Sequence, residues 1–140
     1  MIILDTNVLS ELLVPSPNTN VIDWLASQQP ASIFTTAITE AEILFGLRLL
    51  PEGRRRRDLE AAILPIFTND LSGRILPFDR DAADIYATIA TVRRAAGRPI
   101  SQFDAQIAAI ALSRGASLAT RNEVDFEGIG LEIINPWKAN

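Results

Sequence analysis

Three carboxylates carry the chemistry that this sequence suggests. Asp5 directly follows the apolar run from Met1 to Leu4, and Glu42 and Asp104 each lie near the predicted start of a helix. The chain has no histidine and no cysteine, which excludes an imidazole base, a thiolate nucleophile and a Cys/His zinc site. Carboxylate oxygens are the hard ligands that suit Mg²⁺ or Mn²⁺. We therefore expect metal-dependent chemistry at these acids.

Each acid also has a purely structural explanation. Aspartate is a favoured helix cap, so Asp5 could do no more than cap the helix that follows it. Thr39 and Ser101 stand three residues before Glu42 and Asp104, which is the spacing of a capping box. Three carboxylates grouped in one pocket, however, would repel one another unless they were protonated or neutralised by a divalent cation.

The helical periodicity favours the metal explanation. At about 100° per residue, Glu42 and Asp104 each share a helix face with apolar residues, so both are predicted to point toward the core. The residues on the Glu42 face are Ile38, Ala41, Phe45 and Leu49, and those on the Asp104 face are Ile107, Ala108 and Ala111. The opposite face of the Glu42 helix is apolar too, which is typical of a buried helix or a subunit interface. A buried carboxylate must be paired or metal-bound.

Two further charged segments are open to more than one interpretation. Asn122, Glu123 and Asp125 follow a predicted strand, and one of them could complete the site, although an ordinary solvated turn fits equally well. The run Arg54 to Arg57 is the densest charge cluster. It is either a solvated helix start or a surface that binds phosphate or a partner.

Strands alternate with helices along the whole chain. We expect strands at 1–4, 32–36, 74–77, 116–119 and 131–134. We expect helices opening at Asp5 and over 19–28, 37–50, 54–71, 80–96 and 101–115. This pattern predicts an α/β fold with a mostly parallel sheet of about five short strands flanked by helices, and ligands collect at the carboxyl ends of such strands.

Composition limits the remaining possibilities. A chain of 140 residues, 48% of them hydrophobic, has the size of one domain, and we expect a single domain over residues 1–140. It contains no apolar stretch near the roughly 20 residues that span a bilayer, and its first residues do not resemble a secretory signal, so we expect a cytoplasmic protein. With a net charge of −4, the molecule needs a local basic patch or bound cations to hold nucleic acid.

Five short motifs give these observations a family context. They are Leu4-Asp-Thr-Asn7, Ala41-Glu-Ile-Leu-Phe-Gly46, Phe103-Asp-Ala-Gln-Ile-Ala108, Thr120-Arg-Asn122 and Asn135-Pro-Trp137. In their order and spacing the chain resembles, from end to end, the PIN-domain ribonucleases. Within them it is most similar to the VapC toxins of bacterial type II toxin-antitoxin pairs, close to the FitB branch.

The resemblance implies a PIN-like three-layer fold and endoribonuclease activity that depends on Mg²⁺, with Mn²⁺ as an alternative. It implies that Asp5, Glu42 and Asp104 bind the metal, supported by hydrogen bonds from Thr6 and from Thr120 or Asn122. FitB-like proteins can carry an acid directly after Thr-Arg, where this chain has Asn122.

We expect Asp125 to replace that acid as a fourth catalytic residue. The alternative is a three-acid site with Asn122 as a neutral supporting group. A bound metal would lower the pKa of a water and stabilise the charge on the scissile phosphate. We expect Arg121, Arg54 and Arg55 to contact flanking phosphates or the antitoxin.

The resemblance also implies partners. These are an RNA substrate, a second copy of the chain in a homodimer, and a cognate VapB-like antitoxin whose C-terminal segment blocks the active-site groove. Operator DNA would be bound only through the antitoxin.

Three other functions are alternatives to this one. A receiver-like phosphotransfer domain needs a lysine near the site, and the only lysine is Lys138 in the tail. A haloacid-dehalogenase-type phosphatase needs an aspartate two residues after Asp5, where Asn7 stands. The third rival is a catalytically weak PIN-fold partner of a DNA-binding antitoxin that acts in transcriptional autoregulation. Asn122 leaves this last alternative open.

Overall fold

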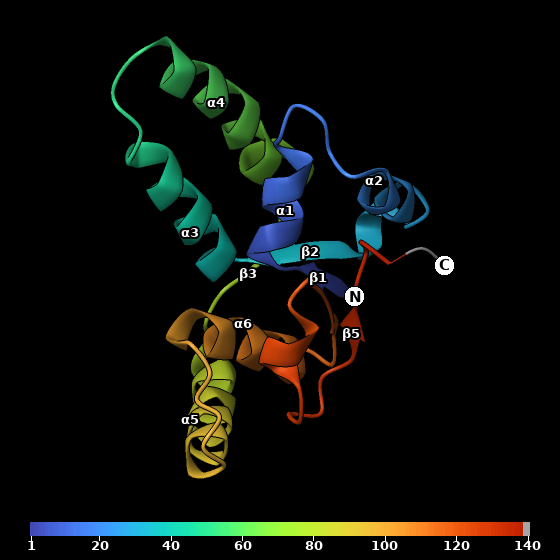
Figure 1. Ribbon diagram of the computed structural model, residues 1–140, viewed down its shortest axis with the longest axis vertical. Coiled ribbons are helices and arrows are strands. Elements are labelled where there is room, and N and C mark those ends of the chain that lie inside the picture. The colour runs from blue at the N-terminus through green and yellow to red at the C-terminus, as the bar shows by residue number, and fades with distance from the viewer. Residues whose placement is uncertain (139–140) are drawn as a thin grey trace.

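The computed structural model describes residues 1–138 and alternates strands with helices, as the sequence predicted (Figure 1). The strands are β1 (Ile2–Leu4), β2 (Ile33–Thr36), β3 (Ile75–Leu76), β4 (Ser117–Ala119) and β5 (Ile133–Ile134). The α-helices are α1 (Thr6–Leu12), α2 (Thr19–Ala26), α3 (Ala37–Arg48), α4 (Arg54–Pro65), α5 (Arg80–Ala95) and α6 (Gln102–Ser113). Short 3-10 helices lie at Pro30–Ser32 and Glu123–Phe126.

The five strands form one sheet in the order β3-β2-β1-β4-β5, and every neighbouring pair is parallel. The predicted α/β fold class is therefore confirmed. The chain runs outward from β1 through β2 to β3, then crosses back to place β4 on the other side of β1. The strand order thus reverses between β1 and β4, and such a switch point leaves a crevice at the carboxyl ends of the two strands.

Alternate residues of the strands face two separate cores, because side chains alternate between the faces of a sheet. Ile3 and Leu118, which are paired in the register of β1 and β4, pack with α5 and α6 on one face. Leu4 and Ala119, the next pair, pack with α1 to α4 on the other face. Figure 1 shows the resulting three layers, with the sheet between the two groups of helices.

One predicted helix is divided in two. The pattern from Arg54 toward Leu71 predicted a continuous helix, but α4 ends at Pro65 and a π-helical turn, Ile66–Asp70, follows it. Proline has no backbone N–H and its ring crowds the preceding turn, which disrupts α-helical hydrogen bonding. The Leu71 amide accordingly donates to Ile66 O at 2.8 Å, five residues back. The other predicted bounds agree with the structure to within two residues.

The predicted orientation of α3 is wrong. Phe45 and Leu49, which were expected to face the core beside Glu42, are 66% and 68% exposed. The buried residues of α3 are Thr39, Ile43 and Leu47. Because α3 is apolar on nearly all sides, its sequence does not determine which face is buried, and the choice is made by packing against α1 and α4.

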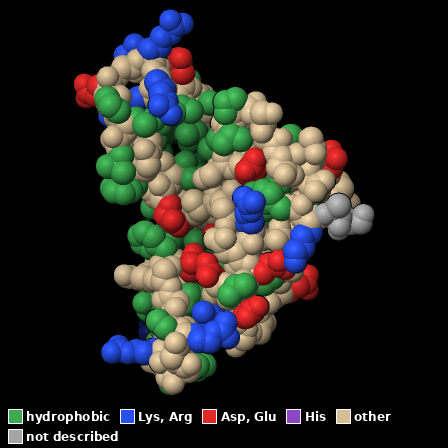
Figure 2. Space-filling model, viewed as in Figure 1, with side chains coloured by type: hydrophobic (Ala, Val, Ile, Leu, Met, Phe, Trp, Pro, Cys, Tyr) green, Lys and Arg blue, Asp and Glu red, His purple; other side chains and the backbone are tan. Residues whose placement is uncertain are grey.

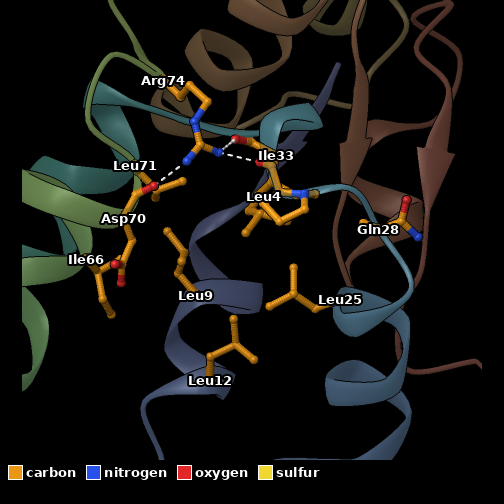
Figure 3. Close-up of a pocket in the computed structure, with 11 residues that line it drawn as sticks. Leu4, Leu9, Leu12, Leu25, Gln28, Ile33, Ile66, Asp70, Leu71 and Arg74 are labelled. Atoms are coloured by element: carbon orange, nitrogen blue, oxygen red, sulfur yellow. Dashed lines mark hydrogen bonds between the residues drawn. The ribbon is translucent and has the colours of Figure 1, made fainter.

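An apolar cavity of about 320 Å³ lies between α1, α2 and the sheet (Figure 3). The leucine side chains of Leu9, Leu12 and Leu25 point into it. At its edge the Arg74 guanidinium donates hydrogen bonds to the carbonyl oxygens of Ile33 and Asp70, which tie β2 to the π-helical turn. The cavity wall is almost entirely aliphatic, so the polar chemistry must lie elsewhere.

Trp24 and Trp137 pack against the core formed with α1 to α4, as expected of core or interface residues. Within residues 1–138, no helix has the length and apolar character needed to cross a membrane.

We expect Leu118→Ala to lower the free energy of unfolding by about 2 to 5 kcal/mol, because it opens a cavity in a fully buried position of the central sheet. Val92→Ala, at a site on α5 that is 54% exposed, should change it by less than about 0.5 kcal/mol. Urea denaturation measures both values. Equal losses in the two variants would contradict the assignment of the core.

Candidate active site

Asp5 lies at the carboxyl ends of β1 and β4, where the strand order reverses. It directly follows β1 and is only 3% exposed, and its backbone amide donates to Ala119 O at the end of β4. Its carboxylate caps α1, accepting a hydrogen bond from the Thr6 amide at 2.8 Å. The capping role foreseen for this residue is thus real, but it uses one carboxylate oxygen and leaves the other for separate partners.

The second carboxylate oxygen of Asp5 has two partners. Thr120 lies far from it in sequence, and Asn7 was not predicted as a site residue. Thr120, the first residue after β4, donates its hydroxyl proton to Asp5 Oδ2 at 2.8 Å. Asn7 Nδ2 donates to Thr120 Oγ1 at 3.1 Å and lies 3.4 Å from Asp5 Oδ2. Asn7 Oδ1 in turn accepts from the Arg121 amide. Asn7 was not predicted as a supporting residue, although its place two residues after Asp5 was the available signal.

Glu42 lies on the other side of Asp5, in the second turn of α3. Its carboxylate accepts a hydrogen bond from Thr6 Oγ1 at 3.0 Å. Thr6 Oγ1 also lies 3.0 Å from Thr39 Oγ1, so Thr39 donates to the hydroxyl whose own proton goes to Glu42. The alternative explanation of Glu42 as part of a capping box with Thr39 does not hold, because the N-cap of α3 is Thr36, whose hydroxyl accepts from the Thr39 amide. Thr39 was not predicted as a site residue.

Asp104 completes the group from the opposite layer of helices. Ser101 caps α6 and accepts a hydrogen bond from the Asp104 amide at 3.2 Å, as its spacing predicted. The predicted face of α6 is also correct, since Ile107, Ala108 and Ala111 are fully buried. Asp104 itself is half-buried, so its carboxylate lies at the border between core and solvent.

The three carboxylates perturb one another electrostatically. Burial raises the pKa of Asp5 to about 6, despite the opposing hydrogen bonds from Thr120 and Thr6, and repulsion from Asp104 and Glu42 adds to the rise. Burial and repulsion from Asp104 also raise the pKa of Glu42. Figure 2 shows acidic side chains gathered where the surface is hollowed between α3 and α6. The fold therefore brings the three predicted acids into one electrostatically strained site.

Comparison with known proteins identifies the family of this chain. The family model described as the PIN domain matches residues 2–130. The chain is 43% identical to "VapC ribonuclease Y4jK" of Sinorhizobium fredii, with 99% of each chain covered. It is 41% identical to "Toxin FitB" of Neisseria gonorrhoeae, with 98% of this chain and 99% of that protein covered.

This chain belongs to the PIN-domain family, in the group of VapC and FitB toxins. A solved structure described as FitAB bound to an IR36 DNA fragment aligns with this PIN domain at a TM-score of 0.89 and 39% identity. That alignment covers all of this chain and 98% of the other.

The donor set of the PIN domain suits a hard divalent cation, because it consists of carboxylates whose pKa values are raised by burial and by repulsion from other acids. In the side-chain arrangement described for residues 1–138, no three acidic groups converge tightly enough to enclose an ion. Asp5, Glu42 and Asp104 fit a metal by their chemistry and electrostatics.

Three of the remaining predicted residues, Asp125, Asn122 and Arg121, lie around this group. Asp125 is exposed in the 3-10 helix Glu123–Phe126, shares a pocket of about 140 Å³ with Asp104, and raises the pKa of Asp104 by repulsion. Asn122 is exposed and its backbone amide donates to Thr120 Oγ1 at 3.1 Å. The Arg121 guanidinium lies 5.3 Å from the centre of the Trp137 ring.

Arg54 and Arg55 are remote from the acids. They lie exposed at the start of α4, where Lys and Arg side chains gather at the top of Figure 2. The structure thus separates these two arginines from Arg121.

We expect Asp5→Asn to stabilise the metal-free PIN domain at pH 7. A folded-state pKa of about 6, above the ordinary 3.8, means that the folded chain binds this proton more tightly than the unfolded chain does. The contribution of this group to the free energy of unfolding is therefore complete below pH 4, and it is lost as the pH rises through about 6. The wild type should lose roughly 2 to 3 kcal/mol relative to Asp5→Asn across that interval.

Thermal unfolding in EDTA, followed by circular dichroism between pH 4 and pH 7.5, checks this expectation. Asp84→Asn, at an exposed position on α5, is the matched control and should follow the wild type. Parallel pH profiles for wild type and Asp5→Asn would contradict the raised pKa of Asp5.

Proposed function

We propose that this PIN domain is the toxin of a type II toxin-antitoxin pair and acts as a divalent-metal-dependent endoribonuclease. The observation that carries the proposal is the gathering of Asp5, Glu42 and Asp104 at the strand switch point with raised pKa values. Uncompensated carboxylates in a crevice are costly to the fold, and they are retained where a cation uses them. We assign the activity to a single domain over residues 1–140, acting in the cytoplasm.

Asp5, Glu42 and Asp104 would hold Mg²⁺, with Mn²⁺ as an alternative. When bound, such an ion supplies an activated water and charge stabilisation at the scissile phosphate. Thr120 and Thr6 keep the Asp5 and Glu42 carboxylates in fixed orientations by donating protons to Oδ2 and Oε1. These hydrogen bonds favour the ionised carboxylates at neutral pH and so prepare them for a cation.

RNA is the substrate class that we infer, and the phosphate contacts follow from the positions of the basic residues. Arg121 follows Thr120 directly, and its backbone amide is bound to Asn7. Its guanidinium rests over the Trp137 ring, which limits its freedom, and within residues 1–138 its N–H groups form no ion pair and can donate to a phosphate. Asp125 beside Asp104 is the proposed fourth acid, and Asn122 acts through its backbone bond to Thr120.

A VapB-like antitoxin is the second proposed partner, and an apolar groove of about 290 Å³ offers a place for its C-terminal segment. The groove runs between α1, α3 and α4, with Thr6 and Glu42 among its lining residues. A neighbouring depression is lined by Arg54, Arg55 and Asp58. Arg54 lies 3.9 Å from Asp58, and Arg55 suits an acidic stretch of the same segment. A segment in this groove would block Glu42. Contact with operator DNA would come only through the antitoxin, in keeping with the FitAB complex bound to DNA.

A homodimer is part of the same proposal. Phe45 and Leu49 are the most exposed large apolar side chains of the described residues, and they lie one turn apart on α3. Such a pair is unfavourable in water and marks a contact surface. A second copy of the chain is the occupant that we propose.

Incubation of the purified protein with total RNA in Mg²⁺, Mn²⁺ or EDTA tests the proposed activity. We expect cleavage with either cation and none in EDTA. Outer-shell partners of a metal site affect activity by roughly 10- to 100-fold, so Asp104→Asn, which removes a ligand, should reduce the rate by more than about 100-fold.

Asp84→Asn is the control for loss of one surface charge and should cut RNA at the wild-type rate. Cleavage that continues in EDTA would contradict the metal-dependent mechanism. If the pure protein binds Mn²⁺ but cuts no RNA under any condition, the alternative function holds, a catalytically weak partner of a DNA-binding antitoxin in transcriptional autoregulation.

A further inference from the structure

Arg93 is the one positively charged side chain that is buried among residues 1–138. It lies in the last turn of α5 and is 7% exposed. None of the ion pairs in the described part of the chain includes it. A buried guanidinium without a carboxylate partner is costly unless its N–H groups are all well bonded, so this residue requires an explanation.

Backbone carbonyl groups from two separate segments take the place of the missing carboxylate. Arg93 Nε donates to Arg98 O at 2.7 Å, in the loop between α5 and α6. Its Nη1 donates to Asp125 O at 2.9 Å and Glu127 O at 3.3 Å, in and just after the 3-10 helix Glu123–Phe126. One planar side chain therefore joins two segments about thirty residues apart in sequence.

A second contact closes the same junction at the surface. Arg98 Nη2 lies 3.2 Å from Glu127 Oε2, but both side chains are more than half exposed. Exposed ion pairs contribute little to stability because water and salt screen them. The buried bonds of Arg93 are therefore the main connection.

One of the two joined segments leads to the residue that supports Asp104, and the other carries Asp125. The α5–α6 loop leads to Ser101, which caps α6 and accepts a hydrogen bond from the Asp104 amide. The 3-10 helix carries Asp125. The side chains of Arg93, Asp104 and Asp125 line the same small pocket of about 140 Å³. Arg93 thus forms part of the wall between the two carboxylates.

We propose that Arg93 is a positioning residue that holds Asp125 against Asp104 by clamping the α5–α6 loop to the 3-10 helix. The inference rests on the proposed function of the site and names a residue that supports it. Arginine suits this role because its rigid, permanently charged fork can donate in several directions at once. Lysine at this position keeps the charge but cannot reach both segments, and it would leave buried carbonyl oxygens without donors.

The test compares Arg93→Lys with Arg94→Lys, its exposed neighbour in the same turn, by three measurements. We expect Arg93→Lys to accelerate hydrogen exchange in residues 98–104 and 123–127, and to raise the Kd for Mn²⁺ measured by calorimetry about tenfold. Its kcat on RNA should fall with little change in KM, because the clamp orients acids rather than binding substrate. Arg94→Lys should match the wild type in all three.

A second variant keeps the inference testable if Arg93→Lys does not fold. Arg93→Gln removes the buried charge and keeps an amide that can donate to only one of the two segments, so it should accelerate exchange in residues 98–104 and 123–127 and raise the Kd for Mn²⁺. Unchanged exchange and an unchanged Kd in the folded variants would overturn the clamp. A wild type that binds Mn²⁺ but cuts no RNA would refute the proposed function, while exchange and Mn²⁺ affinity would still decide the role of Arg93.

Discussion

The burial of the Asp5 carboxylate between the ends of β1 and β4 is the constraint on which the rest of the site depends. A buried carboxylate is unstable unless hydrogen bonds replace its lost water, and here Thr6 and Thr120 supply them from opposite sides. Both donors are in place only because β4 lies beside β1 in parallel register and α1 begins at Asp5. The hydrogen bonds offset only part of the cost, since the pKa of Asp5 remains raised.

The other two acids reach this point from opposite layers of the fold. Glu42 comes from α3, packed on one side of the sheet, and Asp104 comes from α6, packed on the other. Their carboxylates approach Asp5 near the carboxyl ends of β1 and β4, and repulsion from both contributes to the raised pKa of Asp5. The proposed cation binding and the raised pKa values of these acids therefore have the same structural cause, which is the partial burial of like charges close to one another.

Local sequence patterns were sufficient for much of the fold and for part of the site. The alternation of strands and helices, the position of Asp5 after β1 and the buried face of α6 beside Asp104 were all predictable, because each depends on residues adjacent in sequence or one helical turn apart. The face of α3 was not predictable, since the helix is apolar all round and tertiary packing leaves Phe45 exposed. The roles of Asn7 and Arg93 depend on partners more than thirty residues distant, which no local pattern reveals.

A crystal of the protein grown at pH 7 with Mn²⁺, measured by anomalous diffraction at the manganese edge, tests the central claim directly. If the three carboxylates form a cation site, the anomalous map will show a peak whose nearest protein atoms are carboxylate oxygens of Asp5, Glu42 and Asp104. A well-ordered crystal that shows no peak there, or a peak only at other acids, would contradict the account.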